Sequence, residues 1–402
     1  MLELRPMLSA IWRNKISALL IALQLALTLA IISNAAVIVG DRADKMKRPT
    51  GMAVDDIISL TFLAIPQDYD MSAAVTADMA LLREMPGVMD AAPSNQLPLS
   101  GSGSASGYHT KPNEEIGGEG ANQFQSDSHF INALGMKLVA GRNFTEADMH
   151  VVGPNDNYTP SIAIVTQQFA DTMYPEGNAL GKYFYGGGDD HPIEIVGIVE
   201  RNLGSWVNWN NAGNVVVFPT LVVGNFKRYV IRAEPGQRDD VLKRVEDVLA
   251  ERDPRRVFRI ETMSHHKARS YAGDNTMVMV LSAVMGLLTF IVALGIIGLT
   301  FFWINQRRKQ IGVRRALGAT RTAISRYFLL ENLIIAGTGI ALGLAAAQIF
   351  NHMMVSSFKQ PPLTLPVMLA CALILLSVSI VAALVPALRA ANISPATATR
   401  SV

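Results

Sequence analysis

Four long stretches of this 402-residue chain contain no aspartate, glutamate, lysine or arginine, and they constrain the fold more than any other feature. A helix needs roughly 20 apolar residues to cross a lipid bilayer, and each stretch is long enough. Buried helices of a soluble protein can be as apolar, but four such stretches in one chain favour membrane spans. We therefore predict transmembrane helices at residues 16–40, 275–306, 332–358 and 360–388.

The first stretch also shares a feature with secretory signal peptides, because Arg5, Arg13 and Lys15 precede it. A signal peptide has an apolar core of roughly 7–15 residues. The stretch at 16–40 is well beyond that length, which favours an anchor that is retained over a segment that is cleaved.

Residues 41–274, between the first two spans, hold most of the charged residues. Alternation of apolar and polar residues predicts strands here, and apolar residues at helical spacing predict helices. The predicted strands are 57–65, 161–165, 193–199 and 229–233, and the predicted helices are 72–84, 166–174 and 239–252. The fold class is therefore a membrane protein with four transmembrane α-helices and a large α+β extracytoplasmic domain, or two subdomains, inserted between helices 1 and 2.

The distribution of lysine and arginine predicts the orientation, because short cytoplasmic loops are enriched in both. The segment before the first span, the loop 307–331 and the tail 389–402 all carry basic residues. The loop between the last two spans offers only Lys359. Both termini are therefore predicted to be cytoplasmic, with the large domain on the far side of the membrane.

The whole-chain composition excludes several classes of function. The net charge is only +2, which gives no cationic field for nucleic acid. The predicted spans contain no acid or base, whereas proton-coupled carriers typically use one. The single cysteine, Cys371, lies in the fourth span, so the large domain has no disulfide and Cys371 is predicted to be an apolar packing residue.

The most informative segment of the sequence is Gln306–Glu331, which reads QRRKQIGVRRALGATRTAISRYFLLE. Thr320 is placed to cap a helix that runs into the third span. Scattered lysines and arginines would suffice to anchor the loop to the cytoplasmic side. The compact run IGVRRALGA at Ile311–Ala319 indicates in addition a surface shaped for another protein.

This run resembles the signature of the MacB/FtsX-type ABC transporter permeases, also called type VII systems. Further segments resemble the family in the same order along nearly the whole chain. They are Leu8–Leu20, Gly141–Asp148, Ile162–Phe169, Ala179–Lys182, Glu194–Val199 and Pro386–Arg400. The resemblance implies a MacB-like periplasmic α+β domain at 41–274 and a cytoplasmic amphipathic helix at 1–15 that leads into the first span.

The resemblance also implies a surface that contacts an ATPase, in the coupling element at 307–331 and at the start of the tail. Its residues would be Gln310, Ile311, Gly312, Arg314, Arg315, Ala316, Leu317, Gly318 and Arg389. The chain departs from the family at two points. Gln310 stands where a glutamate is usual, and Asn392–Ser394 replace an aspartate that often precedes the terminal proline. The first departure puts in doubt an ion pair between this position and the ATPase.

No phosphate-binding loop of the GxxxxGK[ST] type occurs in the sequence. If the family assignment holds, we expect a non-catalytic permease without its own cofactor, with ATP and magnesium bound by a separate ABC ATPase subunit. The expected partners are that ATPase, a second permease copy or paralogue, membrane lipid and, for efflux, a periplasmic membrane-fusion adaptor and an outer-membrane channel.

The resemblance implies that the permease transmits ATPase motion across the bacterial inner membrane to the periplasmic domain. Efflux of antibiotics, peptides or other small substrates is the favoured outcome. Two alternatives stay open: release of lipoproteins, and regulation of a periplasmic partner such as a cell-wall hydrolase without any transport.

Other candidate sites have weaker support from the sequence. Trp206 and Trp209 could contact a partner or close the core of the domain. The adjacent His265 and His266 lack the spacing of zinc ligands on one helix face, and no GxSxG nucleophile motif occurs. The small residues of the third span, Gly337, Gly339, Gly343 and Ala347, could line a dimer seam or pack within the monomer.

Overall fold

The computed structural model describes residues 12, 15–65, 69–153, 156, 158–224, 226–358 and 360–393. The chain forms two compact units. A helical unit comprises Met1–Lys47 and Gly273–Val402, and an α+β unit comprises Arg48–Ala272. The leading helix expected at 1–15 and the end of the tail, 394–402, lie outside the described residues except for Trp12 and Lys15.

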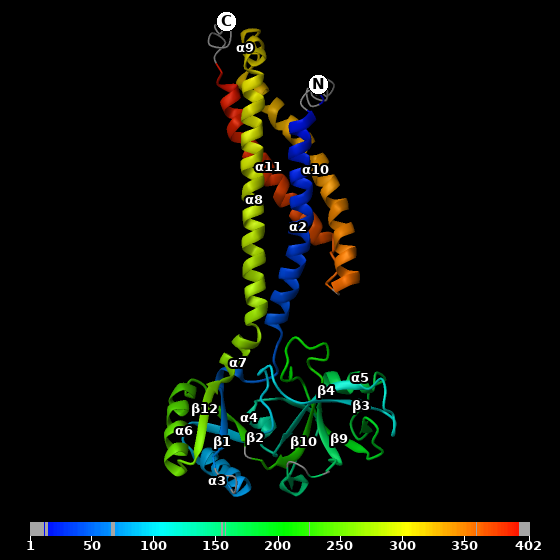
Figure 1. The fold of residues 1–402 in the computed structure, drawn as a ribbon, viewed down its shortest axis with the longest axis vertical. Helices are drawn as coiled ribbons and strands as arrows, with labels where there is room; N and C mark the ends of the chain where they lie inside the picture. The colour runs from blue at the N-terminus through cyan, green and yellow to red at the C-terminus, as the bar shows by residue number, and fades with distance from the viewer. Residues whose placement is uncertain are drawn as a thin grey trace. The chain divides into compact units, whose positions relative to one another are not determined.

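Within its described residues, the helical unit contains four helices that are long and apolar enough to cross a membrane (Figure 1). They are α2 (Lys15–Lys47), α8 (Ala272–Gln306), α10 (Arg321–Phe358) and α11 (Leu365–Ala391). A short helix, α9 (Arg308–Ala316), separates α8 from α10. The side chain of Thr320 accepts a hydrogen bond from the backbone N–H of Ala323 at 3.2 Å, which confirms Thr320 as the cap of α10.

The long helices extend past the charge-free stretches of the sequence, so two acids that lie just outside the predicted spans belong to the same helices. Asp274 lies in the first turn of α8, and Glu331 lies three turns into α10. Both acids are buried and paired with arginine. Asp274 is 2.5 Å from the guanidinium of Arg42, and Glu331 pairs with Arg307. The arginine partners explain how the helices tolerate these carboxylates.

Gly339 and Gly343 of the third span pack within the monomer, whereas a Cβ atom added at Gly337 would meet no atom within 4 Å among the described residues. A Cβ atom added at Gly339 would lie 2.7 Å from the carbonyl oxygen of Ala22, and one at Gly343 would lie 3.0 Å from Ala26. The backbones of α10 and α2 therefore meet directly, which only glycine permits. Ala347 is fully buried in the same helix. Cys371 is buried in the apolar core that the four long helices share, as predicted for a packing residue.

In the α+β unit, the described residues form a sheet of twelve strands in the order β12-β1-β11-β2-β4-β3-β8-β9-β7-β10-β6, with β5 paired to β9. The strands are β1 Ile57–Ala64, β2 Val88–Ser94, β3 Ala105–His109, β4 Glu119–Ser126, β5 Leu138–Gly141, β6 His150–Val152, β7 Ile162–Thr166, β8 Tyr183–Gly186, β9 Ile193–Val199, β10 Val215–Val222, β11 Phe226–Ala233 and β12 Arg256–Thr262. The helices are α3 Met71–Glu84, α4 Phe130–Ala133, α5 Gln167–Met173, α6 Arg238–Arg252 and α7 Met263–Ser270, with 3-10 turns at Val54–Asp56 and Glu146–Asp148.

Two separate apolar cores pack against the sheet. In one core, α3 and α6 pack on β1, β2 and β11 through residues such as Leu82, Tyr229 and Val245. In the other, α5 packs on β7, β9 and β10 through residues such as Phe169 and Phe184. Each of the seven strands and helices predicted from the sequence coincides with an element of the structure, with boundaries that differ by up to three residues.

Candidate functional site

The IGVRRALGA run forms α9 and the turn that follows it. One face of α9 is buried, because Ile311 packs into an apolar cluster with residues from α8, α10 and α11. The buried members of that cluster are Ile304, Ile311, Ile324, Phe328, Ala387, Ala390 and Ala391. Gly312 is buried as well. Helix α9 is thus fastened to the ends of three long helices.

The turn between α9 and α10 depends on Gly318. Its φ of 97° is a left-handed conformation that favours glycine. The N–H of Gly318 donates to the carbonyl of Arg315 at 3.2 Å, and the N–H of Ala319 donates to that of Arg314 at 3.0 Å. These bonds satisfy carbonyl groups at the end of α9. Gly318 therefore serves the shape of the turn, which the sequence run alone did not distinguish from a contact role.

The opposite face of α9 presents two apolar side chains to solvent. Val313 is 50% exposed and Leu317 is 82% exposed. Residues four apart lie on one face of a helix, so Val313 and Leu317 form one exposed apolar patch on α9, whose other exposed residues are mostly basic or polar. The predicted residues Gln310, Arg314 and Ala316 are exposed too. Sequence reasoning missed Val313, although its spacing from Leu317 was a usable signal.

Several arginines of the predicted site make contacts within the chain. The guanidinium of Arg314 lies over the ring of Tyr327, with 5.0 Å to the centroid, and that of Arg389 lies over Phe301 at 5.2 Å. Arg315 donates to the carbonyl oxygen of Ala319 at 3.5 Å. Reversing these charges would disturb the local fold together with any partner contact. Leu317 is therefore the cleaner residue for testing a contact.

An ion pair braces the connection on either side of α9. Arg307 lies just before α9, and it donates to both carboxylate oxygens of Glu331 at 3.0 and 3.1 Å. The two side chains are 13% and 2% exposed. Both bonds come from Nη1 of Arg307, which is shared between the two carboxylate oxygens. The pair therefore joins the end of α8 to α10 across the short helix.

Trp206 and Trp209 lie in a loop of the α+β unit and are both partly buried. Their rings meet edge to face, with centroids 5.9 Å apart. Together with Ala105, Val207 and Ser270 they line a pocket of about 590 Å³. The two rings therefore line an open pocket, and partner contact at Trp206 and Trp209 stays a prediction.

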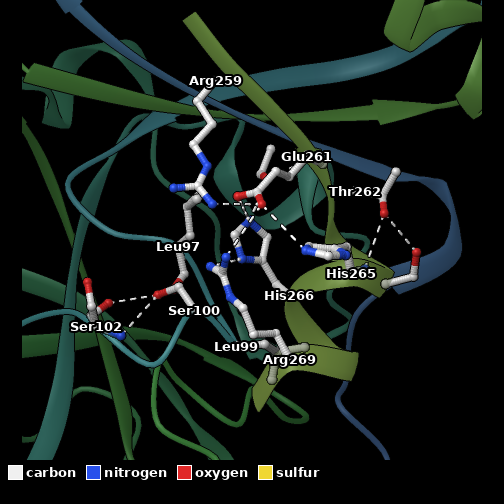
Figure 2. Close-up of polar contacts among 12 residues, drawn as sticks. Leu97, Leu99, Ser100, Ser102, Arg259, Glu261, Thr262, His265, His266 and Arg269 are labelled. Carbon is white, nitrogen blue, oxygen red and sulfur yellow. Dashed lines mark hydrogen bonds and ion pairs between the residues drawn. The ribbon is translucent and has the colours of Figure 1, made fainter. Parts of the chain in front are cut away.

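Figure 2 shows a second polar cluster in the α+β unit, centred on Glu261 of β12. Its carboxylate is 3.0 Å from Arg259, 3.5 Å from Arg269 and 3.6 Å from both His265 and His266. Burial raises the pKa of Glu261, but the hydrogen bond from Arg259 and the nearby positive charges outweigh it and leave that pKa below its usual value. Among the described residues, no group of three or more histidine, cysteine, aspartate or glutamate side chains is arranged so that it could hold a metal ion.

Ser59, His266 and Glu261 superficially resemble a nucleophile, a base and an acid. The hydroxyl of Ser59 lies 2.8 Å from Nε2 of His266. However, Ser59 and His266 are both buried, and the hydroxyl also donates to the backbone oxygen of Glu261 at 3.0 Å. Glu261 approaches the same ring nitrogen as the serine, whereas a catalytic triad needs the acid on the other nitrogen. The cluster is structural.

The buried His266 predicts that the α+β unit loses stability on mild acidification. Burial lowers the pKa of His266 from 6.5. As the pH drops through 6.5, the imidazole is therefore protonated in the unfolded chain but stays neutral in the folded chain. Protonation favours the unfolded state, so the free energy of unfolding falls. Against the effect of burial, the hydrogen bond from Arg259 and the nearby positive charges lower the pKa of Glu261 from 4.5, so its titration is moved away from this range. In the native chain, we expect the urea midpoint from pulse proteolysis to be lower at pH 5.5 than at pH 7.5. The difference between the two midpoints should be smaller in His266→Gln. His265→Gln, which alters an exposed imidazole, should keep the full dependence.

Comparison with known families now gives the class of protein. A family model described as the MacB-like periplasmic core domain matches residues 20–248, and one described as the FtsX-like permease C-terminal matches residues 282–395. The chain belongs to the MacB/FtsX family of ABC transporter permeases and is a membrane protein.

Among individual relatives, the chain is 23% identical over 339 residues to the macrolide export ATP-binding/permease protein MacB 1/2 of Paracoccus denitrificans, covering 81% of this chain and 47% of the relative. It is 23% identical to the uncharacterized ABC transporter permease YknZ of Bacillus subtilis, covering 67% and 68%. The periplasmic region of MacB from Actinobacillus actinomycetemcomitans matches in structure with a TM-score of 0.32 at 13% identity, over 56% of this chain and 97% of that one. The chain thus spans about half the length of the Paracoccus protein.

Proposed function

We propose that the chain is the permease subunit of an ATP-driven transporter in the bacterial inner membrane, with both termini cytoplasmic and the α+β unit periplasmic. An ABC ATPase that binds ATP and magnesium would dock on α9, and a second copy or a paralogue would complete the permease. Family membership supports this assignment, and the basic residues around α9 support the orientation.

The observation that carries the proposal is the division of α9 into two faces. Its inner face is fastened to α8, α10 and α11 by the cluster around Ile311, and its outer face exposes Val313 and Leu317. A push on the outer face would be passed to the long helices, because the inner face of α9 packs against all three of them. Exposed apolar residues ringed by arginine are typical of a protein contact.

Within this class we propose efflux of small apolar or peptide substrates, in cooperation with a periplasmic adaptor and an outer-membrane channel. The support is the macrolide export named for the Paracoccus relative. Lipoprotein release and regulation of a periplasmic partner are the alternatives. Loss of viability or of lipoprotein localisation on deletion, without any change in drug susceptibility, would favour them.

The contact is tested by Leu317→Gln, a change that keeps side-chain size and adds no charge. Burying a leucine contributes about 1.5–3 kcal/mol, and about 1.4 kcal/mol corresponds to a tenfold change in affinity. We therefore expect the affinity for the partner ABC ATPase to fall about 10- to 100-fold. Biolayer interferometry with the permease in nanodiscs measures it.

Leu63→Gln is the matched control. Leu63 lies in the α+β unit and is 49% exposed, so the same substitution there should leave ATPase affinity unchanged. Equal affinities for the native chain and Leu317→Gln would refute docking on this face of α9. An equal loss in both variants would indicate a general effect on the permease instead.

A further inference from the structure

The pocket beside Trp206 and Trp209 has the size and lining of a small-molecule site. Its volume of about 590 Å³ falls within the range of about 300–1,000 Å³ that is typical of ligand pockets. It is lined by Gly101, Ala105, Trp206, Val207, Asn208, Trp209 and Ser270, and none of these described residues has an ionisable side chain. The lining therefore favours a neutral ligand.

The aromatic wall of the pocket is held in place from behind. Gly120 of β4 lies against the indole of Trp209, so closely that a Cβ at this glycine would come within 2.9 Å of the ring. Asn211 donates to the carbonyl of Gly120 at 2.9 Å and fixes the loop to the strand. The edge-to-face contact with Trp206 then orients the second ring. A preformed pair of rings binds a flat ligand without a further loss of side-chain freedom.

Hydrogen bonds also hold the loop that contributes Gly101 to the pocket. The N–H of Gly101 donates to the carbonyl of Ser205 at 2.9 Å, and the N–H of Leu99 donates to that of Gly204 at 2.9 Å. These bonds join the loop before β3 to the loop that carries the tryptophans. The hydroxyl of Ser270 donates to the carbonyl of Leu99, so α7 is attached to the loop before β3.

Both ends of the α+β unit meet at this pocket. Arg48, the first residue of the unit, donates to the carbonyl of Val207 at 2.6 Å, and Ser270 lies two residues before its last residue, Ala272. An occupant would therefore touch the loops that hold both ends of the unit. This arrangement distinguishes the pocket from an accidental hollow in a surface loop.

We infer that this pocket binds neutral, planar apolar molecules, with the indole faces as the main contact and Asn208 and Ser270 as polar groups at its edge. Aromatic contacts of this kind favour rings that stack or meet edge to face. The inference does not depend on docking of an ATPase at α9, because it concerns the α+β unit alone.

The test uses the full chain in nanodiscs, labelled with 5-fluorotryptophan and titrated with 2-naphthol as the probe. The four tryptophans, Trp12, Trp206, Trp209 and Trp303, give separate fluorine signals that Trp→Phe variants assign. We expect the signals of Trp206 and Trp209 to shift saturably. Trp303 lies buried in α8 and reports whether the probe acts through the bilayer.

Ala105→Leu should abolish the shift or weaken binding at least tenfold, because the larger side chain at this lining position obstructs access to the rings while both tryptophans remain. Ala105 is exposed, so the change adds no overpacking in a core. Ala80→Leu, the same substitution at an exposed position of α3, should bind like the native chain. Parallel shifts at Trp206, Trp209 and Trp303, no shift at all, or an unaffected Ala105→Leu variant would each overturn the inference.

Discussion

Replacing Asp78 with asparagine is expected to destabilise the α+β unit by about 3–5 kcal/mol, the usual cost of removing one partner from a buried ion pair. Asp78 of α3 pairs with Arg256 of β12, and each side chain is only 1% exposed. Without the carboxylate, the guanidinium would keep its charge in an apolar core. Pulse proteolysis in urea, applied to the chain in nanodiscs, measures the free energy of unfolding of this unit.

The surroundings of the pair explain why the effect should be so large. Tyr229 donates a hydrogen bond to Asp78 at 2.8 Å. Burial, followed by the charge of Asp78, raises the pKa of Tyr229 well above its usual value, so the phenol stays a donor. Arg256 lies over the rings of Phe62 and Phe258, at 5.2 and 5.0 Å. The pair thus joins α3, β1, β11 and β12 in one core.

Two comparisons make this prediction specific. Glu200→Gln removes one partner of an exposed pair with Lys137, whose atoms are 3.8 Å apart, and should cost less than about 1 kcal/mol. Substituting the three buried polar residues together, as Asp78→Leu, Tyr229→Phe and Arg256→Met, should recover much of the loss, because no polar group is then left without a partner. Equal urea midpoints for Asp78→Asn and Glu200→Gln would contradict the argument.

The sequence predicts those strands whose own residues have a high strand propensity. The segment Ile193–Val199 alternates and is rich in β-branched residues, so β9 was visible locally. By contrast, β3 and β4 contain glycine, asparagine and glutamine, and only their pairing partners make them strands. Pairings such as that of β1 with both β11 and β12 join residues far apart in the chain, which no local pattern encodes.

Strand β10 illustrates a different difficulty, because Pro219 argues against a strand inside a sheet. The structure shows why it is tolerated. On one side of β10, pairing with β7 ends at Val217, and pairing with β6 begins at Thr220. Pro219 falls between the two partners, where its missing N–H breaks no ladder on that side. A tertiary arrangement of this kind cannot be read from the sequence.

In the candidate site too, the sequence predicts the element but not its tertiary contacts. The sequence marked every residue from Gln310 to Gly318 except Val313 as part of a contact surface. The structure assigns Ile311 to the interior, Gly318 to the turn and Leu317 to the solvent. Which face of a short helix is buried depends on the helices it packs against, and here those are the distant ends of α8, α10 and α11. The basic residues indicated that α9 is a contact element, but they could not show which of its residues are buried and which are exposed.

Glu331→Gln is expected to loosen the attachment of α9, because it removes the carboxylate that receives both hydrogen bonds from Arg307. The cost should again be about 3–5 kcal/mol, since both side chains are largely buried and the guanidinium keeps its charge. Amide hydrogen exchange followed by mass spectrometry should show peptides covering residues 304–320 exchanging faster. Peptides from β9 should be unchanged, because the substitution lies in the other unit.

The same exchange experiment shows whether Glu331→Gln acts locally on α9 or on the whole helical unit. It also tests the role of the ion pair in force transmission. Asp44→Asn neutralises an exposed acid in α2 and should leave exchange in 304–320 at its native rate. If Glu331→Gln preserves ATPase binding but lowers transport or ATPase stimulation, the pair acts after docking, as a brace between α9 and α10. Native exchange in residues 304–320 of Glu331→Gln would instead show that the apolar cluster around Ile311 holds α9 without help from the ion pair.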